Sequence, residues 1–424
     1  MERDNRSTPE LPAPRGTNDL LPPESWRWQE VARLALDTFA AAGYAPVDTP
    51  MFEHTEVFER GVGSTSEVVG KQMYTFTDRG GRSLTLRPEL TAPVMRAVLG
   101  HNLHRGRLPV KLAYAGPLFR QERPQKGRYR QFSQVGIEAI GSSDHLVDAE
   151  VIEVGMRFLE RAGAPARLLL NSIGHLDPSC RTGYLKLLVE YLDERAALLA
   201  PVDIERVDTN PLRTFDSKEP NTIDVMRDAP LITDHLCNDC RRHFDAVRSS
   251  LEDLGIAYVL QPRLVRGLDY YTRTAFEFVA GGLGSQNAVG GGGRYDGLAE
   301  SLGGEPLPGI GFALGLDRIL LAAGDEDDGR RGSVTAYVVT VGEAARRAGL
   351  ALATRLRAAG VATDLDLIGR SMKGQMKDAG RSGAKWAVIL GDDELASNRV
   401  TLRDMESGEQ SAVAVEELEE RVRR

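Results

Sequence analysis

Along the first two-thirds of the chain, apolar residues with helical spacing alternate with short strand-like runs. The spacing of Val31, Leu34 and Phe39 predicts a helix from about Pro23 to Ala42. A second predicted helix covers Glu150–Ala162 and ends before a glycine. Aromatic and β-branched residues predict strands at Tyr74–Thr77, Ser83–Leu86, Val110–Tyr114, Phe132–Glu138 and Ala166–Asn171.

Residues 178–254 have a different pattern, which predicts a mainly helical insertion between two strand-rich regions. Its clearest helices are Tyr184–Leu199 and Cys237–Leu254. Strand-like runs at Leu264–Val265 and Ala275–Phe278 follow, and then glycine-dense segments that we interpret as turns. The apolar spacing of Ile310–Ala322 predicts a buried helix.

The pattern changes again after a charged, glycine-flanked run at 325–332, which predicts a linker. Strands at Val334–Val341, Val361–Leu367 and Trp386–Leu390 alternate with helices at Glu343–Ala359 and Met372–Gly380. This alternation predicts a small α/β domain at 333–424 with a largely parallel sheet. Residues 15–324 then form one larger domain, and the proline-rich, polar residues 1–14 are expected to be a disordered tail.

Composition narrows the class of protein. The 424 residues are 42% hydrophobic and 27% charged, which is ordinary for a globular protein with a sizeable core. The net charge of −8 argues against a general nucleic-acid coat but allows an RNA partner that meets local basic patches. Only three cysteines are present, and no segment has the apolar length of a membrane span. We expect a cytoplasmic protein without a membrane partner.

The segment 116–138 has the highest density of candidate functional residues. It reads GPLFRQERPQKGRYRQFSQVGIE. Five basic residues lie between Arg120 and Arg130, against the single acidic Glu122, and Pro124 and Gly127 mark a turn between two strands. Such a hairpin can present guanidinium groups to phosphates, and Phe132 can stack on a base. The alternative is a solvated basic hairpin whose charges pair with each other.

This segment resembles motif 2 of the class II aminoacyl-tRNA synthetases, in the form found in the histidyl-tRNA synthetase family. GIGFALGLDR at 309–318 resembles motif 3, an apolar helix with an arginine directed at the nucleotide, and YAPVDTP at 44–50 resembles motif 1. Two histidine-specific motifs of the family are similar to LVRGLDYY at 264–271 and GGGGRYDG at 290–297. RGTNDLLP at 15–22 and LRPELT at 86–91 also match, although Leu90 stands where the family usually has glycine.

The resemblance covers residues 15–424 and implies a fold and an activity. The fold would be an α+β class II catalytic core with a mainly antiparallel sheet and flanking helices, a helical insertion, and a C-terminal α/β domain of the anticodon-binding type. The activity would be ATP-dependent attachment of L-histidine to tRNA(His) through a histidyl-adenylate. Homodimerisation through the motif 1 region and Mg²⁺ bound with ATP are implied as well.

By the same resemblance, Arg120 and Arg266 are the catalytic residues, because they flank the reacting carboxylate and the α-phosphate. The residues implied in ATP binding are Arg120, Glu122, Arg128, Phe132 and Arg318. Those implied in histidine binding are Glu89, Thr91, Arg120, Gln134, Glu138, Arg266, Tyr270, Tyr271 and Tyr295.

A neutral imidazole has one N–H donor and one nitrogen acceptor, so a carboxylate and a phenol can recognise it together. The family places Glu138 and Tyr271 in these roles. Considered singly, each tyrosine is a candidate for core packing, and only the combined motif favours a ligand role.

The sequence leaves two rival functions open. One is a non-catalytic paralogue, such as the regulatory subunit of ATP phosphoribosyltransferase, and the other is an RNA-binding sensor. Retention of Arg120, Arg266, Arg318 and the C-terminal domain at 333–424 favours the enzyme.

Two further signals are weak. Two thiols and two imidazoles match the number of ligands in a zinc site: His235, Cys237, Cys240 and His243. Three of them lie three residues apart on a predicted helix, so we predict that they share one helix face and form no metal site. In the C-terminal domain a basic stripe suggests tRNA contact or simply a solvated helix face; it consists of Arg370, Lys373, Lys377, Arg381 and Lys385.

Overall fold

The computed structural model describes residues 11–63, 66, 68–125, 127–281, 283, 287–324 and 333–423. The chain divides into two compact units, Met1–Asp19 with Trp28–Asp325 and Leu20–Arg27 with Glu326–Arg424. The predicted linker at 325–332 and residues 1–10 of the predicted tail lie outside the described residues. Within the described residues, no helix combines the length and apolar character needed to cross a membrane.

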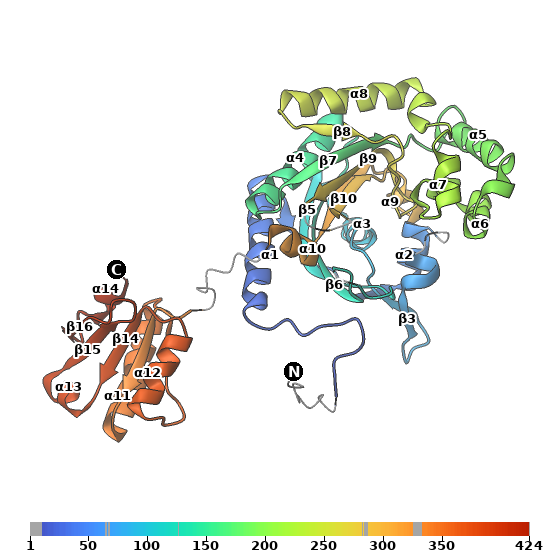
Figure 1. Cartoon of the computed structure of the whole chain (residues 1–424). Helices are drawn as coiled ribbons and strands as arrows, with labels where there is room; N and C mark the ends of the chain where they lie inside the picture. The colour runs from blue at the N-terminus through green and yellow to red at the C-terminus, as the bar shows by residue number, and fades with distance from the viewer. Residues whose placement is uncertain are drawn as a thin grey trace. The chain divides into compact units, whose positions relative to one another are not determined.

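An eight-stranded sheet forms the centre of the larger unit (Figure 1). Neighbouring strands are antiparallel except at the two edges, where β1 pairs with β5 and β8 pairs with β7 in parallel. This confirms the predicted mainly antiparallel core. In spatial order the strands are β1 (Ala45–Pro46), β5 (Val110–Phe119), β6 (Gln131–Ile140), β11 (Gly309–Gly315), β10 (Ala288–Arg294), β9 (Thr272–Ala280), β7 (Ala166–Ser172) and β8 (Tyr258–Leu260).

One face of this sheet packs against helices α1 (Glu24–Ala41), α4 (His145–Arg161) and α8 (Asn238–Asp253). Phe39 of α1 meets Phe158 and Phe312 edge to face, with ring centroids 5.5 and 5.7 Å apart. These three rings are fully or almost fully buried. The apolar faces of α1 and α4 therefore pack against the sheet. The predicted helices at Pro23–Ala42 and Glu150–Ala162 correspond to α1 and α4.

The glycine-dense segment at 290–293 is strand β10 in the middle of the sheet, so its interpretation as a turn is wrong. Its neighbours approach too closely for side chains: a Cβ on Gly292 would lie 2.0 Å from the Gly311 carbonyl oxygen, and one on Gly290 would lie 2.2 Å from that of Ala313. Glycine here is a packing requirement rather than a turn signal.

The predicted helix Ile310–Ala322 is also wrong in its first half. Residues Gly309–Gly315 form β11, and only Leu316–Ala323 form a helix, α10. A short apolar run that is buried on both faces has no periodicity that separates a strand from a helix. Similarly, the run Leu264–Val265 belongs to no strand.

A smaller sheet beside the core has the order β2-β4-β3 and is flanked by three helices. The strands are β2 (Phe52–His54), β4 (Ser83–Leu86) and β3 (Tyr74–Thr77), and the helices are α2 (Thr55–Val62), α3 (Thr91–Gly100) and α9 (Leu298–Ser301). Leu90, immediately before α3, packs with Val94 in an apolar cluster and is 3% exposed.

The helical insertion contains α5 (Arg181–Asp193), α6 (Pro201–Thr209), α7 (Pro220–Met226) and then α8. The first helix is shorter than the predicted Tyr184–Leu199, because a separate 3-10 turn covers Ala196–Leu198. Cys237 lies just outside α8 as its N-cap residue, so the predicted start of this helix at Cys237 is one residue early.

The smaller unit contains a five-stranded sheet with the order β13-β12-β14-β15-β16. Strands β13 (Thr363–Leu365), β12 (Ala336–Thr340) and β14 (Trp386–Leu390) are parallel, whereas β15 (Arg399–Asp404) and β16 (Gln410–Ala414) extend the sheet in antiparallel fashion. Alternate residues of β12 pack against α11 (Glu343–Ala358) and α12 (Met372–Arg381) on opposite faces. The short helices α13 (Asp392–Ser397) and α14 (Leu418–Arg423) complete the unit.

The close packing of β10 and β11 is testable by Gly292→Ala. The new methyl group would collide with backbone, so we expect a lower melting temperature and a loss of about 1–3 kcal/mol or more of stability. Gly297→Ala in the same motif is the matched control, since its Cβ would meet nothing within 4 Å. Equal melting temperatures for the two variants would contradict this explanation of the glycines.

Candidate functional site

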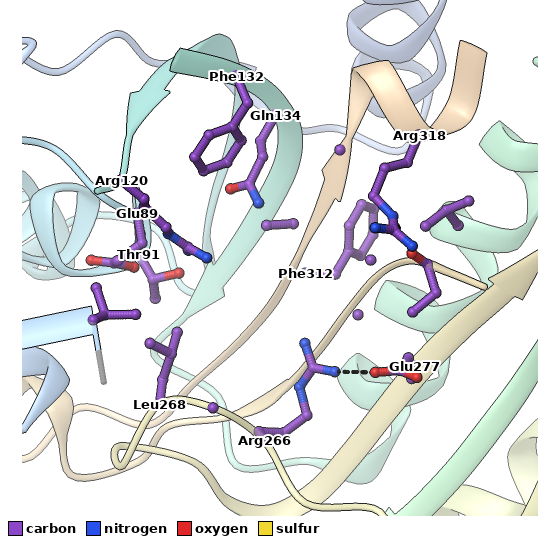
Figure 2. A pocket seen from close by; sticks show the side chains of 18 of the residues that line it. Glu89, Thr91, Arg120, Phe132, Gln134, Arg266, Leu268, Glu277, Phe312 and Arg318 are labelled. Atoms are coloured by element: carbon purple, nitrogen blue, oxygen red, sulfur yellow. Dashed lines mark hydrogen bonds and ion pairs between the residues drawn. The ribbon is translucent and has the colours of Figure 1, made fainter. Parts of the chain in front are cut away.

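A cavity of about 520 Å³ opens on the larger unit, and strands β6, β10 and β11 contribute residues to its lining. Figure 2 shows side chains from distant parts of the sequence turned toward this cavity. All of the site residues predicted from the sequence line it except Glu138: Glu89, Thr91, Arg120, Glu122, Arg128, Phe132, Gln134, Arg266, Tyr270, Tyr271, Tyr295 and Arg318.

Glu138 lies directly behind the cavity wall and is 1% exposed. Its Oε1 accepts hydrogen bonds from the hydroxyls of Thr91 (2.8 Å) and Tyr114 (3.2 Å), and its Oε2 accepts one from Tyr295 (2.6 Å). Because an ionised carboxylate has about four acceptor positions, one remains after these three bonds. Strand β6 therefore holds a buried carboxylate that is nearly but not fully satisfied.

Gly311 is the lining residue in front of this carboxylate. A Cβ on Gly311 would lie 1.9 Å from Glu138 Oε2, so the absence of a side chain leaves room for the acid. Burial raises the pKa of Glu138 to about 8; repulsion by Glu89 adds to this, and hydrogen bonds from Tyr295 and Thr91 oppose it. The pKa therefore lies above neutral, so the carboxyl is mostly protonated at pH 7, and the free acceptor position belongs to its ionised form.

Glu89 stabilises the first turn of α3 at the edge of the cavity. Its carboxylate accepts hydrogen bonds from the backbone N–H groups of Thr91 (2.8 Å) and Ala92 (3.0 Å), as an acid at a helix N-terminus does. The Tyr270 hydroxyl donates to it at 3.5 Å. Burial raises the pKa of Glu89, although these backbone hydrogen bonds and the charge of Arg120 partly compensate.

Arg120 and Arg266 reach the cavity from opposite sides (Figure 2). Arg120 follows β5, donates through Nε to the Pro88 carbonyl oxygen (2.8 Å) and stacks over Phe132 at 5.2 Å from the ring centroid. Arg266 pairs with Glu277 at 3.0 Å, and its buried Nε has no hydrogen-bond partner among the described residues. Two oriented guanidinium groups with spare donors are suited to an anion.

Two more arginines extend the positive charge along the cavity. Glu122 lies between Arg120 and Arg128, 3.7 Å from a guanidinium nitrogen of each. Arg318, at the start of α10, donates through Nε to the Ala288 carbonyl oxygen at 2.6 Å. The basic hairpin is therefore part of a cavity wall and not simply a solvated turn.

The N-terminal motif contacts the same hairpin. The backbone N–H of Arg130 donates to the Gly16 carbonyl oxygen (2.7 Å), and Arg130 Nη1 donates to the Arg15 carbonyl oxygen (3.3 Å). A Cβ on Gly16 would meet the Arg130 side chain at 2.8 Å, and its φ of +88° also favours glycine. Residues 15–16 thus pack against the hairpin.

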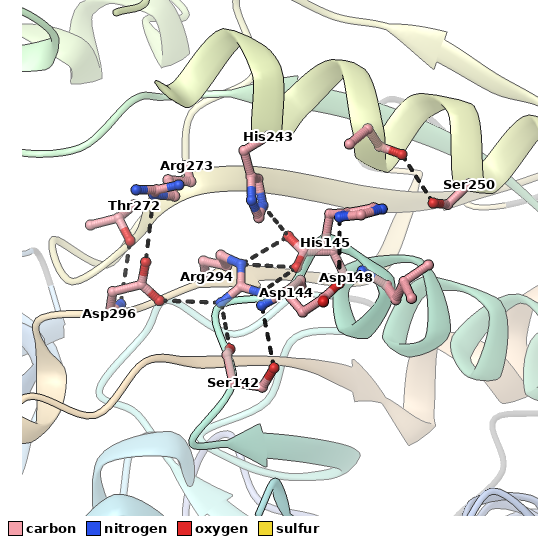
Figure 3. Close-up of polar contacts among 12 residues, drawn as sticks. Ser142, Asp144, His145, Asp148, His243, Ser250, Thr272, Arg273, Arg294 and Asp296 are labelled. Atoms are coloured by element: carbon pink, nitrogen blue, oxygen red, sulfur yellow. Dashed lines mark hydrogen bonds and ion pairs between the residues drawn. The ribbon is translucent and has the colours of Figure 1, made fainter. Parts of the chain in front are cut away.

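Three residues in or near the site have roles that the sequence does not indicate. Glu277 pairs with Arg266, and Tyr114 bonds to Glu138, but neither belongs to a quoted motif. Arg294 does belong to one, yet it is fully buried and pairs with Asp148 at 2.5 Å (Figure 3). Arg294 ends β10 at a point where the register with β9 is irregular, and Tyr295 follows outside the strand, so no simple alternation separates the two residues.

The sequence-based zinc set is dispersed. His243 Nε2 lies 3.2 Å from Asp148 in the network of Figure 3, and His235 stacks on Tyr184 with ring centroids 5.7 Å apart. Cys237 and Cys240 remain together, but Cys237 caps α8 and is not on its helical face. The expectation of a single helix face for these residues is wrong.

The antiparallel sheet, with arginines from the β5–β6 hairpin and α10 meeting at one cavity, defines a catalytic domain of the class II aminoacyl-tRNA synthetase type. A histidyl-tRNA synthetase family model matches residues 16–319, and an anticodon binding domain model matches residues 335–424. The chain belongs to the histidyl-tRNA synthetase family.

Curated relatives agree with this assignment. The chain is 51% identical to a histidine–tRNA ligase of Moorella thermoacetica, over 94% of this chain and 95% of that protein. It is 50% identical to one of Corynebacterium urealyticum, over 98% and 97% of the two proteins. The apo histidyl-tRNA synthetase of S. aureus is 36% identical and superimposes with a TM-score of 0.82, over 98% of this chain and 100% of that one.

Replacement of Glu138 by glutamine tests the buried acid through the pH dependence of stability. In the unfolded chain this carboxyl titrates near 4.5 and in the folded chain near 8, so between these values the unfolded state loses the proton first. The free energy of unfolding of the wild type should therefore fall as pH rises from 4.5 to 8. At about 1.4 kcal/mol per pKa unit, this loss amounts to a few kcal/mol. Glu138→Gln should lack this loss.

The measurement is chemical denaturation of both proteins at pH 5 and pH 8.5. Glu305→Gln, which removes an exposed carboxyl outside this cavity, is the control. A stability difference between wild type and Glu138→Gln that does not change with pH would show that the acid is not buried in this way.

Proposed function

We propose that the chain attaches L-histidine to tRNA(His) in two steps, through a histidyl-adenylate made from ATP. The observation that supports this most is the convergence of Arg120 and Arg266 on a cavity whose wall holds the buried acid Glu138. The first step brings the histidine carboxylate to the α-phosphate, both anionic. Positioned cations lower the cost of that approach and of the charge that develops in the transition state.

In this proposal Arg120 and Arg266 flank the reacting carboxylate and α-phosphate. Both are fixed by neighbours before substrate arrives, Arg120 by the Pro88 carbonyl and Arg266 by Glu277. Arg266 uses Nη1 to bind Glu277, which leaves Nη2 as the donor that would face the reacting anion. Fixed donors need little reorganisation during the reaction, which is the main source of electrostatic catalysis.

ATP would occupy the part of the cavity formed by the hairpin and α10. Arg128 and Arg318 would hold the terminal phosphates, Phe132 and Arg318 would sandwich the adenine, and Glu122 would assist nucleotide binding. Mg²⁺ would enter with the triphosphate as part of the substrate. A hard cation takes oxygen ligands, and Glu122 and Glu277 are carboxylates that line this part of the cavity.

Histidine would bind with its imidazole ring over Gly311. One ring N–H would take the remaining acceptor position of Glu138, and the Tyr271 hydroxyl would donate to the other ring nitrogen. Tyr270 and Tyr295 would line the pocket around the imidazole ring. Glu89, Thr91 and Gln134 would bind the α-ammonium. A substrate without both ring nitrogens would leave buried polar groups unpaired, which costs about 10⁴-fold or more in selectivity.

We further propose that the smaller unit contacts the tRNA. Among the predicted basic residues, Asp378 pairs with Arg370 and, at 3.4 Å, with Arg381, so these two are partly neutralised. Lys373 and Lys377 are exposed one turn apart on α12. Exposed lysines at this spacing can meet successive backbone phosphates, whereas the neutralised arginines favour a structural role.

We also propose a cytoplasmic homodimer. Exposed apolar side chains lie next to the motif 1 segment: Met51 and Phe52 are each about half exposed, and Phe52 packs edge to face on the exposed Phe76. A second copy of the chain would cover this surface. The chain has only three cysteines, which suits a reducing compartment.

The rival proposals are a regulatory paralogue and an RNA-binding sensor. Neither requires the reactive anion site, and the chain keeps Arg120, Arg266 and Arg318 at one cavity. It also keeps a C-terminal unit, which an anticodon binding domain model matches over residues 335–424. These observations favour the enzyme.

The proposed activity is measurable as histidine-dependent exchange of pyrophosphate into ATP. Wild type should exchange, and Arg266→Ala should do so about 10²-fold more slowly or worse, because one fixed donor to the reacting anion is lost. Arg263→Ala, which removes an exposed arginine three residues away, should keep wild-type exchange. Absence of exchange by the wild type with Mg²⁺ would favour a non-catalytic paralogue instead.

A further inference from the structure

Four side chains with soft or imidazole ligand atoms meet at the base of the helical insertion. We call His175, Cys180, Cys237 and Cys240 the thiol cluster. Their ligand atoms all lie within 4.8 Å of one another. His175 Nδ1 is 3.0 Å from Cys240 Sγ and 3.8 Å from Cys237 Sγ. Two of the four residues, His175 and Cys180, are distant in sequence from the Cys237–Cys240 pair.

These distances are close to those of a tetrahedral metal site. With Zn–S near 2.3 Å and Zn–N near 2.0 Å, tetrahedral geometry puts neighbouring ligand atoms about 3.5–3.8 Å apart. The widest pair in the cluster would contract by about 1 Å, and the closest pair would separate by about half an ångström. Rotation of side chains within their loops supplies shifts of this size.

The backbone around the cluster is arranged for sulfur ligands. Cys237 precedes α8, and the backbone N–H of Cys240 in its first turn donates to Cys237 Sγ at 3.4 Å. Gly174, beside His175, has a φ of +64°, and a Cβ there would lie 2.8 Å from Cys180 Sγ. A turn-plus-helix pair of thiols and a glycine that makes room for the third thiol indicate a built site.

We propose that His175, Cys180, Cys237 and Cys240 bind one structural Zn²⁺ through one nitrogen and three sulfurs. Three thiolates and an imidazole suit zinc, and four protein ligands leave no open position for catalysis. Cys180 and Cys240 are each 1% exposed, so the metal is enclosed. A disulfide would engage two thiols only and would leave the converging imidazole without a role.

The metal joins the two ends of the insertion. His175 and Cys180 lie between β7 and α5, whereas Cys237 and Cys240 lie at the start of α8, so residues 181–236 form a loop closed by the ion. Arg181, next to Cys180, donates through Nη1 to the Tyr271 carbonyl oxygen at 2.6 Å. The site therefore stabilises the insertion and, through Arg181, the backbone of a residue in the candidate histidine pocket.

The direct test is the metal content of the full-length chain, purified without chelators and without a histidine tag. Inductively coupled plasma mass spectrometry should find about one zinc per chain. Cys237→Ser and Cys240→Ser should each lose most of it. His235→Asn, which alters the stacked histidine outside the cluster, should keep it. His175→Cys should also keep it, because a fourth thiolate replaces the imidazole.

Cobalt substitution provides a second readout. Co²⁺ in the wild type should show thiolate charge-transfer bands and the strong visible bands of a tetrahedral ion, and these should shift in His175→Cys as the ligands change from three sulfurs and one nitrogen to four sulfurs. If a serine variant fails to fold, titration of the wild type with an organomercurial should release its zinc as the three thiols react.

The proposal would be overturned by a folded wild-type chain with less than about a tenth of a metal per chain. It would also be overturned by zinc that stays bound in both serine variants, or by a mass that shows two of the three thiols joined as a disulfide. Metal content is measured without substrate, so this result is independent of the pyrophosphate exchange.

Discussion

The burial of one carboxylate, that of Glu138, constrains the construction of the whole cavity. Taking an acid out of water is costly unless its oxygens are bonded, and three hydroxyls from separate elements supply those bonds. The neighbouring strand β11 must also lack a side chain opposite the acid, and Gly311 meets this requirement. The β10 glycines, which look like turn signals in the sequence, have a separate cause, because the backbones of β9 and β11 leave no room for a Cβ there.

The charges around the cavity follow a related rule. Each arginine proposed to meet an anion is held by another group: Arg266 by Glu277, Arg120 and Arg128 on either side of Glu122, and Arg318 by a carbonyl oxygen. These partners orient the guanidinium groups, which keep additional donors for a ligand. The same cavity thus combines a fixed cationic region with a nearly satisfied acid, and each suits a different end of the proposed amino-acid substrate.

Most of the candidate site residues are implied by the resemblance of their motifs to those of the histidyl-tRNA synthetase family, and the structure brings them to one cavity. The arginine-rich hairpin, the strands at β3, β4 and β14, and helices α1, α11 and α12 follow from local pattern. Other features depend on strand register, which the sequence does not reveal. Glu277 of β9 meets Arg266, and His175 meets Cys240 of α8, through tertiary packing that no local sequence pattern encodes. The same limit explains the misassigned β10 and β11, where tertiary packing decides between turn, helix and strand.

A crystal structure of the full chain with L-histidine and a non-hydrolysable ATP analogue would test most directly how the cavity works. The imidazole ring should lie over Gly311 with one nitrogen in hydrogen-bond contact with Glu138, and the histidine carboxylate should lie between Arg120 and Arg266, facing the α-phosphate. An imidazole bound away from Gly311, or a nucleotide bound in a cavity that these two arginines do not line, would contradict the proposed arrangement.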